Sequence, residues 1–284
     1  MNIVLENDLL KVEISTRGAE IMSVKGCDGT EFIWDGNPDF WSSRAIVLFP
    51  VCGGLKEGKY TLSGKEYSLT KHGFVRNMEF EVEKRTETSV TFLLTDTEET
   101  RKMYPFSFNF RVIFTLSEKT LSAVYSVENR SETDMYFSVG AHEGYACPGG
   151  IDRYKVEFEE KETLKSFLVD GPLLSDKSVI IAKDTYELPL IYEYFAVDAL
   201  IFRELNSRKL KLSGEGKEIT VEFPDFDHLL LWTVPNAGFI CIEPWSGLPD
   251  VVGSGFELSK KESITTVSSG GIKEFTHKMT FERI

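Results

Sequence analysis

The sequence predicts an all-β fold, namely a large antiparallel β-sandwich with few short helices. Apolar and polar residues alternate with a period of two, for example over Leu10–Ser15, as in a strand with one buried face. Helical periodicity is nearly absent, so the crossover helices that a parallel sheet requires are missing. Short glycine-containing turns separate the apolar segments, which is typical of antiparallel sandwiches.

The predicted strands combine this alternation with β-branched and aromatic residues, and Gly, Pro, Asn or Ser bound them. In chain order they are Leu10–Ser15, Val90–Leu94, Phe108–Leu116, Leu121–Val127, Met135–Val139, Ile219–Phe223, Leu229–Thr233, Phe239–Glu243 and Ile264–Ser268. Arg44–Pro50 is interpreted as a further strand that enters a glycine turn at Cys52–Gly54.

Helical turns are expected only at Asn37–Trp41 and at Thr97–Met103, the second ending before Tyr104-Pro105. Tight turns are expected at Ser63–Lys65 and Asn236–Gly238. No Pro/Ser-rich linker divides the chain, and one core is possible at this size. We therefore expect a single domain over residues 1–284.

Charge excludes several partners. The chain has 45 acidic and 32 basic side chains, a net charge of −13, and no basic cluster longer than Lys260-Lys261. Nucleic acids and anionic membranes need concentrated positive charge, and no apolar run approaches the roughly 20 residues that span a bilayer. We expect a small uncharged or weakly charged ligand, no nucleic acid and no membrane, and a monomer or weak homodimer.

The cysteines indicate a reducing environment. Cys27, Cys52, Cys147 and Cys241 lie far apart without a CxxC pair, and the first residues carry no basic-then-apolar leader. We therefore expect free thiols and a cytoplasmic location.

Two histidines lie beside glycines where strands are expected to meet loops. They are His72 in Lys71–Phe74 and His142 in Gly140–Tyr145. Histidine exchanges protons near neutral pH, and glycine lets the backbone approach a ligand. The alternative for each is a turn histidine bonded to the backbone. The other two, His228 and His277, are expected at the surface or at strand edges.

A carboxylate is expected at the end of an apolar strand. Glu243 follows Phe239–Ile242 and is followed by Pro244 and Trp245. Pro244 is expected to end the hydrogen-bonded pairing of the strand. Poor solvation would raise the pKa of Glu243 and make it a general base, and a Trp face suits a sugar ring. The alternative is a Glu–Arg pair at a sandwich corner.

Other kinds of chemistry have weaker signals. His142 and Cys147 are the nearest approach to a metal-ligand set, so no metal is expected. Neither Cys52 nor Cys241 is followed by an oxyanion-hole signature of a Cys–His nucleophile. Arg44 is either a ligand clamp or a solvated edge residue.

Four motifs in order carry a resemblance to a known family. They are Leu48-Phe49-Pro50 with its glycine turn, His72-Gly73-Phe74, Gly140-Ala141-His142 and Ile242-Glu243-Pro244-Trp245. In this order they resemble the aldose 1-epimerase (galactose mutarotase-like) family, and most of all its LacX-type branch. The resemblance extends from Arg17–Ile21 to the final strands.

The resemblance implies a galactose mutarotase-like sandwich that binds a free hexopyranose without cofactor or metal. It implies that Glu243 is the base for the anomeric hydroxyl, that His142 is the acid for the ring oxygen, and that His72 bonds the sugar. Asp198 occupies the place of a sugar-binding aspartate. The remaining candidates for substrate contact are Arg44, Arg76, Trp245 and Tyr145.

Departures from the family pattern bear on the substrate. Gly54 stands where relatives commonly have a basic residue, and Glu143-Gly144-Tyr145 follows His142 where many have Pro and an aromatic. The first departure argues against a phosphorylated sugar, although Arg44, Arg76 and Lys71 could replace the basic group. Besides a mutarotase acting on free hexoses, two alternative functions therefore remain: a hexose-6-phosphate 1-epimerase, and a non-catalytic sugar-binding protein.

Overall fold

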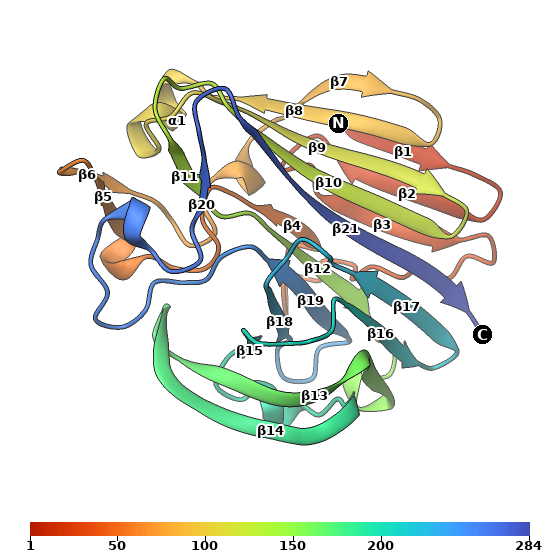
Figure 1. Cartoon of the computed structure of the whole chain (residues 1–284). Helices are drawn as coiled ribbons and strands as arrows, with labels where there is room; N and C mark the ends of the chain where they lie inside the picture. The colour runs from red at the N-terminus through yellow and green to blue at the C-terminus, as the bar shows by residue number, and fades with distance from the viewer.

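The computed structural model describes all residues, 1–284, and most of the chain lies in antiparallel strands (Figure 1). All pairs of named strands run antiparallel, which confirms the predicted fold class. The largest sheet has 14 strands. Its spatial order is β4 (Ala45–Leu48), β12 (Gly140–Ala146), β19 (Phe239–Trp245), β18 (His228–Trp232), β15 (Leu200–Phe202), β13 (Tyr154–Asp170), β16 (Lys209–Gly214), β17 (Lys217–Glu222), β21 (Ile272–Arg283), β10 (Thr120–Asn129), β9 (Phe108–Ser117), β8 (Ser89–Thr95) and β7 (Glu81–Arg85), with β14 (Leu173–Pro189) paired to β13.

Smaller elements complete the fold. The other sheets are β1 (Asn2–Glu6), β2 (Leu10–Ser15) and β3 (Ile21–Gly26); β5 (Lys59–Leu62) and β6 (Lys65–Ser68); and β11 (Met135–Phe137) with β20 (Thr265–Val267). The helices are α1 (Glu98–Met103) and the single 3₁₀ turns η1 (Lys56–Gly58), η2 (Val75–Asn77), η3 (Ile151–Arg153), η4 (Tyr192–Phe195) and η5 (Leu258–Lys260). No helix has the length and apolar character needed to cross a membrane.

The main core lies between the faces of the folded sheet. It contains 66 buried residues from Ile3 to Phe281, and along β2, β9 and β10 buried residues alternate with more exposed ones. Phenylalanines fill much of this space; Phe49 stacks on Phe110 with ring centroids 4.6 Å apart. The period-two pattern of the sequence therefore directs one side of each strand into the core.

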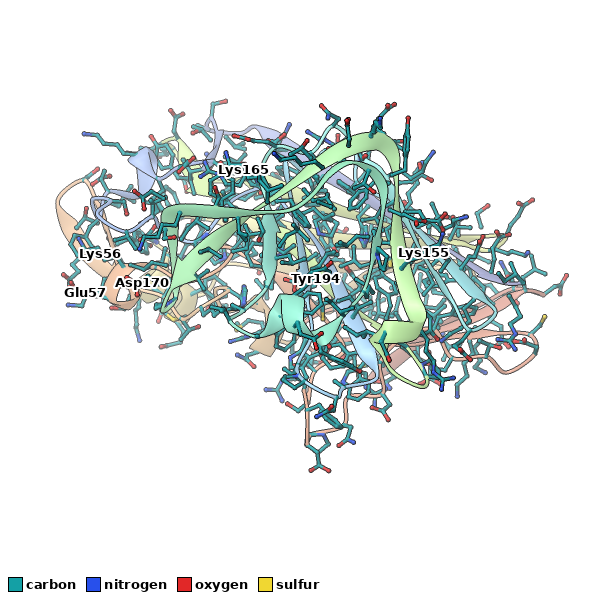
Figure 2. The ribbon with its side chains drawn as sticks, turned by 90° about the horizontal axis from the view of Figure 1, so that it is seen from below. Lys56, Glu57, Lys155, Lys165, Asp170 and Tyr194 are labelled. Carbon is teal, nitrogen blue, oxygen red and sulfur yellow. The ribbon has the colours of Figure 1, made fainter.

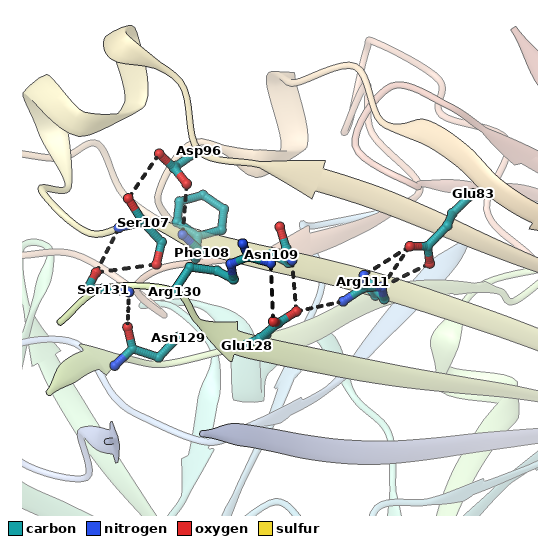
Figure 3. A network of polar contacts seen from close by, with 10 residues as sticks. All are labelled: Glu83, Asp96, Ser107, Phe108, Asn109, Arg111, Glu128, Asn129, Arg130 and Ser131. Atoms are coloured by element: carbon teal, nitrogen blue, oxygen red, sulfur yellow. Dashed lines mark hydrogen bonds and ion pairs between the residues drawn. The ribbon is translucent and has the colours of Figure 1, made fainter. Parts of the chain in front are cut away.

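A polar network connects strands near the β7 end of the large sheet (Figure 3). The Arg111 guanidinium on β9 donates to the Glu83 carboxylate of β7 at 2.9 Å and to Glu128 of β10 at 3.1 Å. Because these side chains lie on the solvent side, the network fixes strand register without placing charge in the core.

The longest strands were not predicted. β13 and β14 form a ribbon of two 17-residue strands that curves below the rest of the sheet in Figure 1. Seen from below in Figure 2, the ribbon crosses the face of the molecule, with Lys155 and Lys165 along it and Asp170 near its turn. Register shifts interrupt the pairing at several points, and such bulges hide the period of two from a sequence reading.

The short helical turn predicted at Asn37–Trp41 is confirmed, since the Phe40 and Trp41 amides both donate to the Asn37 carbonyl. Two other local predictions need correction. Pro244 does not end the strand: β19 continues to Trp245 because its partner β18 still pairs Leu229 with Pro244.

The second correction concerns two histidines. His228 and His277 were expected at the surface or an edge, but both are buried, and His277 has no exposed area. Its strand, β21, alternates between core and solvent, and His277 falls on the core side between Phe275 and Met279.

Candidate active site

A cavity of about 560 Å³ opens on the outer face of β12 and β19, beside the β13–β14 ribbon. Most of the residues predicted for the site line this cavity. They are His72, Arg76, His142, Asp198, Glu243 and Trp245. They come from segments far apart in the chain, so the fold of the sheet is what brings them together.

The acid and base candidates lie on neighbouring strands. His142 on β12 and Glu243 on β19 both face the cavity, and His142 Nε2 lies 3.3 Å from Glu243 Oε2. The pairs Gly140–Trp245 and Glu143–Ile242 place the two residues side by side across the ladder. A hydrogen-bonding distance is therefore built into the strand register.

Burial controls the protonation of this pair. It raises the pKa of Glu243 well above 4.5 and lowers the pKa of His142 to about 3, because each charged form loses hydration. Both shifts favour a protonated Glu243 beside a neutral His142. The alternative arrangement, a carboxylate beside an imidazolium, holds the same single proton and differs only by its transfer across the 3.3 Å contact.

A sharp turn aims His72 into the cavity. His72 adopts a left-handed backbone (φ 69°), and Gly73 follows with φ 72°. A Cβ at Gly73 would lie 2.1 Å from the Phe49 carbonyl oxygen, so only glycine permits this close approach. The Gly53 amide donates to His72 Nδ1 at 3.1 Å, which leaves the proton on Nε2 as a donor for a ligand.

The rim of the cavity carries charges without partners. Lys71, Arg76 and Asp198 line it, and none of the three side chains forms an ion pair in this protein. A Cβ at Gly54 would lie 2.7 Å from the Pro172 carbonyl oxygen. The ribbon turn therefore occupies the space that a basic side chain at position 54 would need.

Two candidates do not line the cavity. The Arg44 guanidinium turns away and donates to the Met22 carbonyl at 2.6 Å, while its amide donates to Glu20. Tyr145 lies in the main core, because it shares the inward face of β12 with Ala141 and Glu143. Neither side chain is part of the candidate active site.

Sequence reasoning missed an aromatic wall. Trp41 and Trp232 line the cavity beside His142, and Phe195 on η4 lines it as well. Trp41 stacks on the His142 ring with centroids 5.0 Å apart, and Trp232 meets that ring edge-on at 5.8 Å. The sequence predicts only that Trp41 ends a helical turn, and the residues around it carry no signal for this contact.

One thiol lies near the acid and base. Cys241, His142 and Glu243 have ligand atoms within 4.8 Å of one another. The Cys241 side chain, however, belongs to an apolar cluster with Trp34 and Phe239, and burial raises the pKa of its thiol well above 9. A thiol that holds its proton so firmly is a poor ligand, and we assign no metal or cofactor to these residues.

Comparison with known proteins identifies the family. The family model described as aldose 1-epimerase matches residues 1–265. The chain belongs to the aldose 1-epimerase family. Among its relatives in this family, the plasmid-encoded protein LacX of Lactococcus lactis subsp. lactis is 35% identical, with 94% of this chain and 95% of that protein covered.

Solved structures of relatives have the same fold. A galactose mutarotase related enzyme from Lactobacillus acidophilus is 36% identical with a TM-score of 0.94, covering 99% of this chain and 97% of that one. A galactose mutarotase-like protein from Lactobacillus casei ATCC 334 is 30% identical with a TM-score of 0.95, and the match covers 99% of this chain and 100% of that one. The resemblance drawn from the four motifs, including the LacX-type branch, is confirmed.

Proposed function

We propose that this member of the aldose 1-epimerase family interconverts the α and β anomers of a hexopyranose by acid–base catalysis. The observation that carries the proposal is the buried pair at the cavity wall, with His142 Nε2 and Glu243 Oε2 3.3 Å apart. An acid and a base on one face can reach the two oxygens bonded to the same anomeric carbon. The reaction needs no other reactant.

The reactive form has Glu243 as carboxylate and His142 as imidazolium. Glu243 accepts the proton of the anomeric hydroxyl while His142 donates its proton to the ring oxygen, and the bond from that oxygen to the anomeric carbon breaks. The product is the open-chain aldehyde, with the proton now on Glu243. Rotation about the bond beside the carbonyl exposes its other face, and closure reverses both transfers. The pair holds one proton before and after the reaction.

The remaining polar residues supply binding. His72 Nε2–H is available to donate to a sugar oxygen, and Asp198 offers a carboxylate acceptor in the same cavity. Trp245 lies 5.4 Å from the His72 ring, measured between ring centroids, and also lines the cavity. These groups surround the acid and base and would hold a ring in one orientation.

The decisive experiment is polarimetry of freshly dissolved α-glucose and α-galactose with the wild-type protein and with Glu243→Gln. The amide keeps the shape of the side chain but cannot accept the proton, so turnover should fall by about 10²–10⁴-fold. Glu193→Gln, an exposed glutamate on nearby η4, is the matched control and should keep wild-type turnover. If the wild-type protein accelerates mutarotation of no aldose tried while it binds one, the protein is a non-catalytic sugar-binding protein.

One observation favours a second candidate function, 1-epimerisation of a hexose 6-phosphate. Lys71 and Arg76 lie at the cavity without any acidic partner, although the chain carries 13 more acidic than basic groups. Unpaired cations at a ligand cavity suit an anionic substituent on the substrate. This observation opposes the sequence argument from Gly54, because the cations come from another segment.

A further inference from the structure

Trp41 covers one face of the acid candidate. Its ring is stacked on the His142 imidazole, with an interplanar angle of 28° and a centroid distance of 5.0 Å. Trp232 approaches His142 at 75°, and His72 approaches it at 86°. Among these three rings, only Trp41 is stacked on the imidazole.

Several residues hold Trp41 in this place. The Trp34 indole N–H donates to the Trp41 carbonyl at 2.8 Å, and the Phe239 ring stacks on Trp41 at 5.5 Å. Gly144, which follows His142 by two residues on the same face of β12, has no side chain, and a Cβ there would lie 2.9 Å from the Trp41 ring. The strand thus leaves a flat surface on which the indole lies beside the acid.

We propose that Trp41 is a positioning residue that fixes the plane of the His142 ring and stabilises its protonated form through the face of the indole. The inference rests on the proposed function for its catalytic meaning, but the contact and its effect on the histidine do not depend on turnover. A cation within about 6 Å of an indole face is attracted by the ring electrons, most strongly where water is excluded.

The other charged groups around His142 show why such support is needed. Lys71 and Arg76 lie near enough to oppose its protonation, and burial opposes it more strongly. His72, itself buried, faces His142 from the η2 side. On the β19 side Glu243 is the one acidic group in contact, and it holds the shared proton when the pair is neutral. Trp41 adds an attraction that acts only on the imidazolium, so it shifts the pair toward its reactive form.

The test compares Trp41→Leu with Trp41→Phe. Leucine removes the aromatic face, and kcat should fall by about 3- to 30-fold, the factor that corresponds to one cation–π contact. Phenylalanine keeps a face and should recover most of the loss. Phe40→Leu, on the same turn but exposed and outside the cavity, is the matched control and should keep the wild-type kcat.

A second readout is independent of turnover. In the Glu243→Gln background, NMR follows the titration of the His142 ring without its coupled partner. Trp41→Leu should lower the pH at which this ring titrates by about 0.5 to 1.5 pH units, and Trp41→Phe should lower it less. Titration at the same pH in Trp41→Leu and in the parent, or an equal effect of Phe and Leu, would overturn the proposal. A shifted titration in a protein that turns over no aldose would leave the role of Trp41 intact and refute the proposed function instead.

Discussion

His142 and His72 both face the cavity, but their surroundings give them different capacities. His142 contacts the carboxyl group with which it shares a proton, whereas His72 accepts from the Gly53 amide at Nδ1 and is left with a single donor. Burial lowers the pKa of His72 well below 6.5, so it stays neutral. In the proposed mechanism His142 therefore transfers the proton, and His72 holds the sugar.

Substitution should separate these roles. His142→Asn should lower kcat by about 10²–10⁴-fold, the usual loss for one general acid. His72→Asn should cost about 2- to 10-fold in kcat/KM, the value of one neutral hydrogen bond, with part of the change in KM. Steady-state polarimetry over a range of sugar concentrations measures both constants. Equal losses of kcat at unchanged KM in the two variants would show that the roles are not distinct.

Lys71 and Arg76 decide between the candidate substrates. If a 6-phosphate binds them, Lys71→Gln and Arg76→Gln should each lower kcat/KM for glucose 6-phosphate by about 10-fold or more, since each loses a charged hydrogen bond. Free glucose and galactose should be affected much less.

Salt gives an independent check on the same question. The preference for glucose 6-phosphate over free hexoses should shrink as salt is added. Lys183→Gln on the outer strand β14 is the control and should leave this preference unchanged. A preference for neutral hexoses that does not respond to salt or to either cavity substitution would confirm the prediction from net charge and Gly54 instead.

Strands β12 and β19 carry the site on one face and the core on the other. On β12, His142 and Gly144 face the cavity, while Ala141, Glu143 and Tyr145 face inward. A one-residue change in register would exchange these faces and place the acid in the core. Strand β12 therefore tolerates little change in side-chain volume on its cavity face or on its core face.

Gly144→Ala tests this element. The added methyl group would meet the Trp41 ring at 2.9 Å, the Arg44 carbonyl oxygen at 3.1 Å and the Trp34 Cβ at 3.2 Å. Two of these contacts are backbone or rigid atoms, so the indole must shift, and stability should fall by about 1–3 kcal/mol. Urea unfolding measures the loss, and kcat should fall with it.

A matched glycine provides the control for Gly144. Gly238→Ala, in the loop before β19, meets only the Cys147 carbonyl oxygen at 3.4 Å and should change stability little. If Gly144→Ala is as stable and as active as Gly238→Ala, then the packing of Trp41 on β12 is not what holds the acid in place.

Across the whole molecule, a buried polar pair connects two distant strands of the 14-stranded sheet through the core. Glu143 Oε1 on β12 lies 3.7 Å from His277 Nδ1 on β21, and neither residue is exposed. Glu143 Oε2, both His277 nitrogens and the Tyr145 hydroxyl have no hydrogen-bond partner. Burial raises the pKa of Glu143 to about 8 and lowers the pKa of His277 to about 3, so both are neutral at pH 7.

This pair should give stability a defined pH dependence. Folded Glu143 keeps a proton that the unfolded chain releases above about pH 4.5, so its contribution to the free energy of unfolding falls as pH rises from 4.5 to about 8. Folded His277 lacks a proton that the unfolded chain binds below about pH 6.5, so its contribution falls as pH drops from 6.5 to about 3. The two slopes oppose each other between pH 4.5 and 6.5.

Glu143→Gln isolates the carboxyl contribution. Relative to wild type, the variant should gain about 1.4 kcal/mol in the free energy of unfolding for each pH unit between about 6.5 and 8. Urea unfolding at several pH values, with the exposed Glu193→Gln as control, measures the difference. A variant that is strongly destabilised at neutral pH would show that Glu143 is ionised and paired with a charged His277.

The local sequence pattern was sufficient to predict the type and position of most elements. The prediction of Leu10–Ser15 coincides with β2, that of Phe108–Leu116 falls within β9, and Thr97–Met103 contains α1. In these segments a period of two, or a capping threonine before a short run, reflects contacts made within the element or with its next neighbour. The β13–β14 ribbon was missed because bulges break its period.

The sequence by itself determined the fold class, the family, and the identity of Glu243, His142 and His72 as residues to consider, because motif order and strand period are properties of the chain. Only the tertiary structure decided which side of a strand faces the cavity. It directed Tyr145 and His277 into the core, turned Arg44 away, and brought Trp41 onto His142. The physical reason is that such contacts join residues that lie on different strands or loops, from 22 to about a hundred positions apart in the chain. Sheet pairing and packing, rather than local preference, set their distances.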